Sequence, residues 1–459
     1  MSESTTGKKL DTPWPTLSTI RQKMSQPITM YSELIAQYPT SESLFAFLKS
    51  PAGGNLVIRD NRQNPEDSTV IIHYGDTKVD GFRSVVWNTR TNRPLCAAPP
   101  VSKHTVAEDA TGFVAEEFID GVMLNMFWDT GRSAWRLASR SQIDAQNTFY
   151  SRRPFAELFD EAVHASSLDL NELSRDYTYS WVLQHPAERI VTLTPYGIPR
   201  VRLVQMARFL ENGDQLVVKE PTTFLTKAFR DLLPERHELK TGADVTARLA
   251  AWGHRFGVQW KGLVLKNDDG SMVTLRTTQY NEAREMRGNS AKLAFVWLER
   301  WSAMKLNQYL KIYPEEAHAA NTVVESFKQC TQDAFNYYQA IYKRREYPLG
   351  KAPQKYRKLL WDIHAAHAGS YFPKLRTFMN EQDTARKLWL VNYEVRYPDA
   401  ETTSQEVRPA EVTSQEVMTP AEVRSGDIEN AEALASVNAA EAADEDDKYD
   451  TLAATASAC

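Results

Sequence analysis

The chain has 459 residues, of which 42% are hydrophobic and 10% aromatic, and a formal net charge of −5; this length leaves room for two or three domains with cores of ordinary size. Every apolar run falls short of the about 20 residues that span a bilayer, and the start, MSESTTGKK, lacks the apolar core of a signal peptide, so we expect no membrane segment. Three widely spaced cysteines argue against a disulfide framework or a structural zinc site, and we expect an intracellular, cytoplasmic protein.

Short strands dominate the first part of the chain after a polar start. Residues 1–28 are polar with scattered prolines, which predicts a flexible arm. Residues 30–50 mix helical spacing with turn residues, which indicates one or two short helices. Beyond them, three hydrophobic stretches are separated by Asn, Asp, Gly and Pro clusters, the pattern of strands and turns. These stretches are residues 56–58, 70–72 and 84–87.

The strand pattern continues to residue 273 with two interruptions. Apolar residues at three- and four-residue spacing predict helices over 155–167 and over about 244–255. Antiparallel strands with a few covering helices are typical of an α+β domain, which we place at residues 29–280. Residues 281–392 have helical periodicity almost throughout, so we predict an all-helical C-terminal domain of about four to six helices.

Six segments follow one another in a specific order between residues 83 and 280. The first is RSVVW at 83–87, followed by a proline-rich stretch and Lys103. The others are EEFIDG at 116–121 with a hydrophobic strand after it, WRLASR at 135–140, YSWVLQHPAERI at 179–190, KGLV at 261–264 and TLR at 274–276. An Asp-Gly pair between hydrophobic runs is by itself an ordinary hairpin signal. The order of the segments is therefore the informative feature.

Together these segments resemble the motifs of RNA ligases, whose superfamily also contains DNA ligases and mRNA-capping enzymes. Those enzymes attach a nucleotide through the lysine of a Lys-x-Asp-Gly motif. The chain is identified as a member of the covalent nucleotidyltransferase superfamily, RNA-ligase branch, and resembles the degenerate ligase-like proteins that large DNA viruses encode. The resemblance implies an antiparallel-sheet nucleotidyltransferase domain that binds nucleotide and RNA.

Four positions depart from the motifs of this family. Phe118 stands where the nucleophilic lysine is expected and has no lone pair to attack a phosphate. Val182 and Lys261 stand where glutamates are expected, and Lys261 reverses the charge beside the expected metal path. Thr274 replaces the first lysine of the last motif. We therefore assign no catalytic residue and expect that no cofactor is required.

The resemblance also implies a set of nucleotide-binding residues. Asp120 can bond a ribose, and Gly121 lets the backbone pass close to a ligand. The full set is Asp120, Gly121, Arg140, Trp181, Lys266 and Arg276. Taken singly, such residues also fit an ordinary turn or a solvated strand end. If the chain were an active ligase, Lys261 would be the fallback nucleophile, with Lys103 and Lys266 as further candidates, and ATP and magnesium would be its cofactors.

A basic stretch lies within the predicted helical domain. Residues 342–358 contain seven cations and three tyrosines, a composition that suits RNA binding. The predicted RNA-binding residues are Lys343, Arg344, Arg345, Lys355, Arg357 and Lys358. The alternative is a solvated helix hairpin whose tyrosines face the core. His364 and His367 have a spacing that can hold zinc, but no other ligand cluster accompanies them, so we predict no metal site.

An acidic segment closes the chain. Residues 400–459 contain fourteen acidic and three basic residues, a net charge of −11, so residues 1–399 carry +6. A short repeat, TSQEVRPAEV followed by TSQEVMTPAEV, lies within it. Excess charge with few aromatics predicts a disordered tail over residues 393–459. Such a tail can bind a protein partner or compete with RNA for the basic body.

Three functions are consistent with these patterns. The leading hypothesis is a pseudoenzyme that has lost the adenylylated lysine and binds RNA or nucleotide. The second is an active ATP-dependent RNA ligase that uses a lysine outside the family position. The third is a structural or assembly protein of a large DNA virus, found in the host cell or the virion. Covalent labelling by ATP or GTP separates the second from the others, and RNA crosslinking separates the first from the third.

Overall fold

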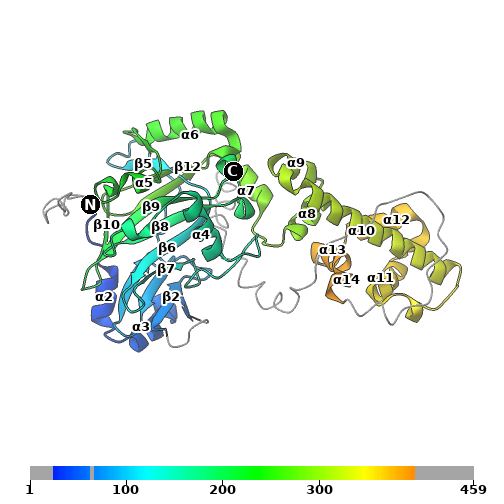
Figure 1. Cartoon of the computed structure of the whole chain (residues 1–459). Helices are drawn as coiled ribbons and strands as arrows, with labels where there is room; N and C mark the ends of the chain where they lie inside the picture. Colours follow the sequence, from blue (N-terminus) through cyan, green and yellow to red (C-terminus); the bar gives the residue numbers. More distant parts are fainter. Residues whose placement is uncertain (1–23, 62–66, 398–459) are drawn as a thin grey trace, which may run out of the picture. The chain divides into compact units, whose positions relative to one another are not determined.

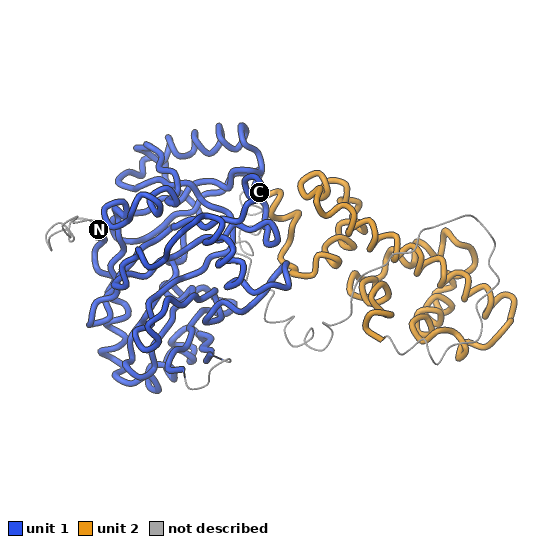
Figure 2. Tube along the Cα trace, viewed as in Figure 1, with its two compact units in different colours: residues 1–280 blue, residues 281–459 orange. Residues whose placement is uncertain are grey.

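The computed structural model describes residues 24–61 and 67–397. The chain divides into two compact units, residues 1–280 and residues 281–459, which are coloured separately in Figure 2. Helix α7 (Thr278–Arg287) begins in the first unit and ends in the second. Antiparallel sheets in the first unit and helices in the second confirm the predicted α+β class.

The first sheet of unit 1 has four antiparallel strands in the order β1-β2-β3-β4. Figure 1 labels its strand β2. The strands are β1 (Val57–Asp60), β2 (Thr69–His73), β3 (Val85–Asn88) and β4 (Arg93–Ala97). Helices α2 (Met30–Gln37) and α3 (Ser41–Leu48) pack against this sheet. Tyr31 of α2 and Trp87 of β3 lie in one buried cluster, and their burial holds the helices to the sheet.

The second sheet has five antiparallel strands in the order β10-β9-β8-β6-β7. The strands are β6 (Val122–Asp129), β7 (Ala134–Ala138), β8 (Thr178–Gln184), β9 (Arg200–Phe209) and β10 (Gln215–Val217). Helix α4 (Phe155–Ala165) packs on β8 and β9, where the Phe159 ring lies 6.1 Å from the Trp181 ring. All residues of β8 are buried, because this central strand is covered on both faces.

The third sheet has four antiparallel strands in the order β11-β5-β12-β13. The strands are β5 (Val114–Glu117), β11 (Arg236–His237), β12 (Gly262–Lys266) and β13 (Met272–Arg276). Helix α6 (Gly242–Phe256) covers one face of it, since Val245 is buried with Leu263 and Leu275. The short helix α5 (Lys227–Arg230) precedes β11.

Seven α-helices follow α7 in the described part of unit 2. They are α8 (Leu293–Ser302), α9 (Leu306–Ile312), α10 (Ala317–Tyr338), α11 (Gln354–Ala365), α12 (Phe372–Asn380), α13 (Thr384–Val391) and α14 (Tyr393–Arg396). Phe327 and Cys330 of α10 share a buried cluster with Leu360 and Leu375. Six of these helices, α8 to α13, lie within residues 281–392, for which four to six helices were predicted, and α14 lies beyond that range.

Most predicted elements of unit 1 are present. The helices predicted over 155–167 and about 244–255 correspond to α4 and α6, and the three predicted strands correspond to β1, β2 and β3. The predicted arm differs in its last residues, because Met24 bridges Val218 and Ile28 bridges Gln215. Residues 1–23 of that arm lie outside the described residues.

The other end of the described chain also differs from the expected pattern. The predicted tail began at residue 393, but α14 occupies its first four residues and Tyr393 is buried. Residues 398–459 lie outside the described residues. Among the helices of residues 24–61 and 67–397, none has the length and apolar character needed to cross a membrane.

Candidate functional site

The segment EEFIDG at residues 116–121 connects two sheets of unit 1. Strand β5 of the third sheet ends at Glu117, and β6 of the second sheet begins at Val122. Between them, the Phe118 amide donates to the Gly262 carbonyl at 2.9 Å and extends the pairing of β5 with β12 by one residue. The motif therefore carries its side chains into the junction of the two sheets.

Phe118 lies against a buried cation at this junction. The Lys261 Nζ atom is 3.9 Å from the centroid of the Phe118 ring and 5.5 Å from that of Tyr280. The Arg276 guanidinium carbon is 5.9 Å from the same Phe118 ring. An aromatic face attracts a cation at these distances. We call Phe118, Asp120, Lys261, Arg276 and Tyr280 the Phe118 cluster.

Asp120 joins three segments of unit 1 through its carboxylate. Its Oδ2 atom accepts hydrogen bonds from the Val191 and Thr192 amides, both at 3.0 Å. Its Oδ1 atom accepts a 2.6 Å hydrogen bond from the Tyr280 hydroxyl and lies 3.6 Å from Lys261 Nζ. A carboxylate has about four acceptor sites, and three of them accept hydrogen bonds from protein groups. The Lys261 ammonium lies beside Oδ1 as an ion-pair partner.

The surroundings of Asp120 keep it ionised. Burial acts to raise its pKa, but the charge of Lys261, the Tyr280 hydroxyl and the two backbone amides together hold the pKa below its usual value. Asp120 is 4% exposed and Lys261 is 5% exposed. The two side chains therefore form a buried ion pair.

Gly121 is required by the close approach of β6 to β8. Its φ angle is 147°, and a Cβ atom at this position would lie 2.3 Å from the Leu183 carbonyl oxygen and 2.8 Å from Val182 Cγ1. Val182 is 4% exposed, so its apolar side chain fills the space beside the glycine. The departures at 118, 182 and 261 therefore belong to one region, in which Phe118 contacts Lys261 and Val182 packs at Gly121.

Thr274 on β13 belongs to a separate polar contact. Its hydroxyl lies 2.7 Å from the Ser102 hydroxyl and 3.2 Å from His104 Nδ1. The neighbouring Lys103 is exposed, and its carbonyl accepts from the Thr274 amide at 2.8 Å. The segment before the motif is thus fixed along β13 by side-chain and backbone bonds.

The remaining predicted nucleotide-binding residues occupy three different environments. Lys266 forms a 2.6 Å ion pair with Glu116 and donates to the Val204 carbonyl at 2.7 Å. Arg140 lies over the Tyr74 ring at 4.8 Å. Trp181 is completely buried on the face of β8 that packs against α4, opposite to the face of Val182. Of the predicted set, Asp120, Gly121 and Arg276 come together at the junction, and Trp181 lies in the core.

Two arginines of β9, Arg200 and Arg202, lie near the Phe118 cluster and were not predicted from the sequence. Gln184 donates to the Asp120 carbonyl at 2.9 Å and accepts from Arg200 Nε at 2.7 Å. Arg202, two residues further along β9, lies 4.0 Å from Glu117. Burial lowers the pKa of both guanidiniums, and Arg202 lowers that of Arg200 further. The alternating arginines of the segment RVR at 200–202 were the available signal.

The predicted RNA-binding residues of unit 2 separate into two groups. Lys343, Arg344, Arg345, Arg357 and Lys358 are exposed. Lys355 is 8% exposed and forms a 3.0 Å ion pair with Glu394. Lys355 therefore faces the interior and does not share a surface with the other five.

The described residues offer no arrangement of three or more His, Cys, Asp or Glu side chains that could hold a metal ion. The His364 ring stacks on that of Tyr342, with 4.0 Å between the ring centroids and an interplanar angle of 7°. In residues 24–61 and 67–397 the two cysteines, Cys96 and Cys330, are buried free thiols.

No protein-family model and no curated protein matches this chain. Among solved structures, the chain is similar to an archaeal ATP-dependent RNA ligase, form 2, with 11% identity, a TM-score of 0.37 and coverage of 80% of this chain and 81% of that one. Form 1 of an archaeal ATP-dependent RNA ligase gives 13% identity, a TM-score of 0.36 and 79% coverage of each chain. The chain is also similar to one described as a putative ATP-dependent DNA ligase from Aquifex aeolicus. The sequence identity is 12%, the TM-score is 0.38, and the match covers 78% of this chain and 80% of that one.

Proposed function

We propose that this protein binds nucleotide or RNA without forming a covalent adduct, as a pseudoenzyme with the motif order of an RNA ligase. The observation that carries the proposal is the contact between Phe118 and Lys261. The residue at the nucleophile position is an aromatic ring, and the nearest buried amine of the cluster lies on the face of that ring.

A lysine acts as a nucleophile only when its amine is uncharged. Lys261 lies 3.6 Å from the Asp120 carboxylate and over the Phe118 ring, and both neighbours attract an ammonium. Lys266, at the other end of β12, forms a 2.6 Å ion pair with Glu116. Lys261, the lysine at the junction, is flanked by a carboxylate and an aromatic ring that both favour its charged form.

Cations around the motif support non-covalent binding of phosphate. Arg276 lies in the Phe118 cluster, Arg200 is joined to Asp120 through Gln184, and Arg202 lies beside Glu117. Lys261 lies 3.6 Å from Asp120 and Arg202 lies 4.0 Å from Glu117, whereas Arg200 and Arg276 contact Gln184 and the Phe118 ring. An anionic ligand would complete the balance through charge-assisted hydrogen bonds.

Magnesium does not fit the Phe118 cluster. Magnesium prefers oxygen ligands and is usually held by carboxylates together with substrate phosphates. Asp120 supplies the carboxylate of the cluster, it accepts three hydrogen bonds from protein groups, and an ammonium lies 3.6 Å from it. We therefore expect phosphate binding to be independent of magnesium.

The proposal is tested by measuring binding and covalent capture on the same preparation. ATP and a single-stranded RNA should each bind in calorimetry, with and without magnesium. The double variant Arg200→Gln, Arg202→Gln should weaken ATP binding by roughly ten-fold or more, because a hydrogen bond to a charged group contributes about 1.5–3 kcal/mol. Arg255→Gln, which changes an exposed arginine of α6, is the control. Absence of binding by the folded wild-type protein would overturn the proposal.

A second function, that of a protein-interaction module, is favoured by one loop of unit 1. Leu193, Tyr196 and Ile198 are 52%, 98% and 54% exposed, and residues 192–199 contain no charged side chain. Tyr196 has a φ angle of 55°, a backbone conformation that residues other than glycine seldom adopt. Exposed aliphatic and aromatic side chains on a fixed loop suit an apolar protein surface.

A further inference from the structure

The positive charge of unit 2 is concentrated in one segment. Residues 343–376 contain nine lysines and arginines and two acidic residues, a net charge of +7. Residues 281–342 contain seven of each sign, and residues 377–397 contain three of each sign. The entire excess of positive charge in the described part of unit 2 therefore comes from residues 343–376, which we call the basic segment.

An exposed tryptophan accompanies this charge. Trp361 is 55% exposed on α11, although large aromatic side chains are usually well covered. It follows Arg357 by four residues and Lys358 by three, so the three side chains share one helix face. The Lys358 Nζ atom lies 4.5 Å from the centroid of the Trp361 ring. This face thus combines a stacking surface with cations.

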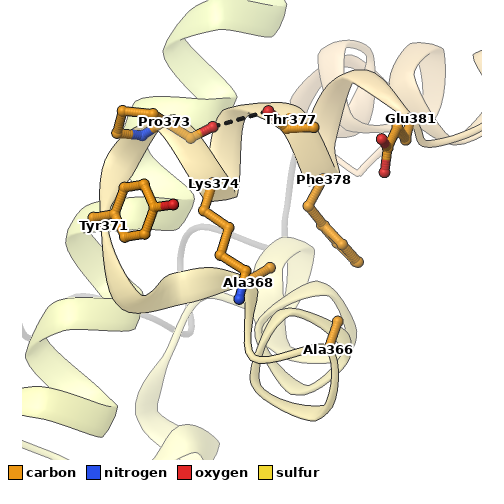
Figure 3. A pocket seen from close by; sticks show the side chains of 8 residues that line it. All are labelled: Ala366, Ala368, Tyr371, Pro373, Lys374, Thr377, Phe378 and Glu381. Carbon is orange, nitrogen blue, oxygen red and sulfur yellow. Dashed lines mark hydrogen bonds between the residues drawn. The ribbon is translucent and has the colours of Figure 1, made fainter.

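A pocket of about 440 Å³ lies at the end of this segment, between residues 366–374 and the following Thr377, Phe378 and Glu381. Figure 3 shows Lys374 and Phe378 projecting from α12 towards the turn that carries Ala366 and Ala368. Tyr371, which is 58% exposed, stands beside Lys374 at the wall. The pocket therefore presents two aromatic rings, an exposed ammonium and the carboxylate of Glu381.

We propose that the basic segment binds single-stranded RNA, with bases stacked on Trp361 and Tyr371 and phosphates held by the exposed cations. Unstacked bases beside a phosphate backbone are the chemistry that exposed aromatic rings and interleaved cations recognise. A folded protein partner would match the charge but not require two open stacking faces. The proposal deepens the function proposed above, since it names RNA as the polymer and places its contact in unit 2.

The test uses the full chain and a fluorescent oligouridylate of roughly 20 nucleotides, longer than most single-strand sites. Trp361→Ala and Tyr371→Ala should each weaken binding by roughly 5- to 150-fold, the effect of losing one stacked base. Trp361→Phe should retain part of the affinity because it keeps a ring. Met304→Ala, which removes an 83% exposed side chain of unit 2 outside the segment, should change nothing.

Two double variants, each of which removes two positive charges, complete the test. Lys358→Gln with Lys374→Gln should reduce the dependence of affinity on salt, whereas Lys305→Gln with Lys311→Gln should leave it unchanged. All four lysines are exposed. Unchanged affinity in folded Trp361→Ala and Tyr371→Ala proteins would overturn the proposal, as would equal binding of an RNA duplex. Equal binding of oligothymidylate would overturn the assignment to RNA.

Failure here is distinguishable from failure of the function proposed for unit 1. If ATP binds and Arg200→Gln with Arg202→Gln weakens it, while Trp361→Ala leaves RNA affinity unchanged, the basic segment is excluded and the phosphate site of unit 1 stands. If the aromatic variants lose RNA binding and ATP does not bind, the basic segment stands and the phosphate site of unit 1 is excluded.

Discussion

The ammonium of Lys261 lies 3.9 Å from the centroid of the Phe118 ring. The resemblance described above expects a lysine at position 118 and a glutamate at position 261, and this chain has an aromatic ring and an amine there. The arrangement places a positive charge beside Asp120 in an ion pair.

Exchanging the two residues tests this relationship. Phe118→Lys places a second amine beside Lys261 and should destabilise unit 1, because like charges meet in a buried site. Adding Lys261→Glu supplies a partner of opposite charge, so the double variant should be more stable than the sum of the single effects by about 0.5–3 kcal/mol. Urea unfolding of the four proteins measures this coupling. Additive effects would show that the two positions do not interact.

Gly121 should tolerate no side chain. Gly121→Ala should cost about 1–3 kcal/mol, because the backbone has a φ of 147° and the new Cβ would meet the Leu183 carbonyl. Gly75→Ala is the matched control in the same unit, since its Cβ would find only an ordinary contact with Val57 at 3.9 Å. Denaturant midpoints report both effects. A Gly121→Ala protein as stable as the control would contradict the described approach of β6 to β8.

Asp120 should contribute stability in a pH-dependent way. Asp120→Asn leaves Lys261 buried without its counter-charge, and breaking such a pair costs about 3–5 kcal/mol. Because folding lowers the pKa of Asp120, its contribution is complete above the unfolded pKa of about 3.9 and is lost as the pH falls through the folded value. The difference in unfolding free energy between wild type and variant should therefore shrink below about pH 4.

An exposed pair provides the control for Asp120. Lys219 and Asp268 lie 2.8 Å apart, but Asp268 is 82% exposed in its side chain. Asp268→Asn should change stability by about 0–1 kcal/mol, as surface pairs do. Equal effects of the two substitutions would show that Asp120 is not buried in an ion pair.

In the basic stretch of unit 2, we expect the exposed cations to affect RNA binding and the buried Lys355 to affect stability. Changing the five exposed cations to glutamine should make the salt dependence of RNA binding shallower, by roughly 0.7 in the log–log slope for each phosphate that is no longer bound. The residues are Lys343, Arg344, Arg345, Arg357 and Lys358. Lys355→Gln should leave that slope unchanged and lower the thermal midpoint, because Lys355 is buried against Glu394. The reverse pattern would show that Lys355 reaches the RNA.

Local patterns predicted the elements better than their contacts. The spacing of apolar residues located α4 and α6, and turn residues separated β1, β2 and β3, because these signals act within one element. The burial of Lys355 could also have been predicted from helical spacing. Lys355 precedes the buried Leu359 by four residues and so lies on the same face of α11. Composition alone placed it among the surface cations.

Contacts between distant segments could not be predicted in the same way. Tyr280 and Asp120 are 160 residues apart in the sequence, yet the tyrosine hydroxyl donates a hydrogen bond to the carboxylate. No local pattern in the sequence marks that tyrosine. The face of Trp181 was also hidden, because every residue of β8 is buried and the strand shows no polar alternation. The Phe118 cluster depends on how two sheets meet, which is a property of the whole unit.

Intact-mass measurement of the denatured chain tests the central claim most directly. The full-length protein is incubated with ATP or GTP and magnesium, with a nucleotide-free sample as reference, and the mass of the unfolded chain is recorded. We predict that the mass remains that of the unmodified chain while ATP binding is detected in the native protein. An increase by one nucleoside monophosphate, lost in Lys261→Ala or Lys266→Ala, would contradict the account and establish a covalent nucleotidyltransferase.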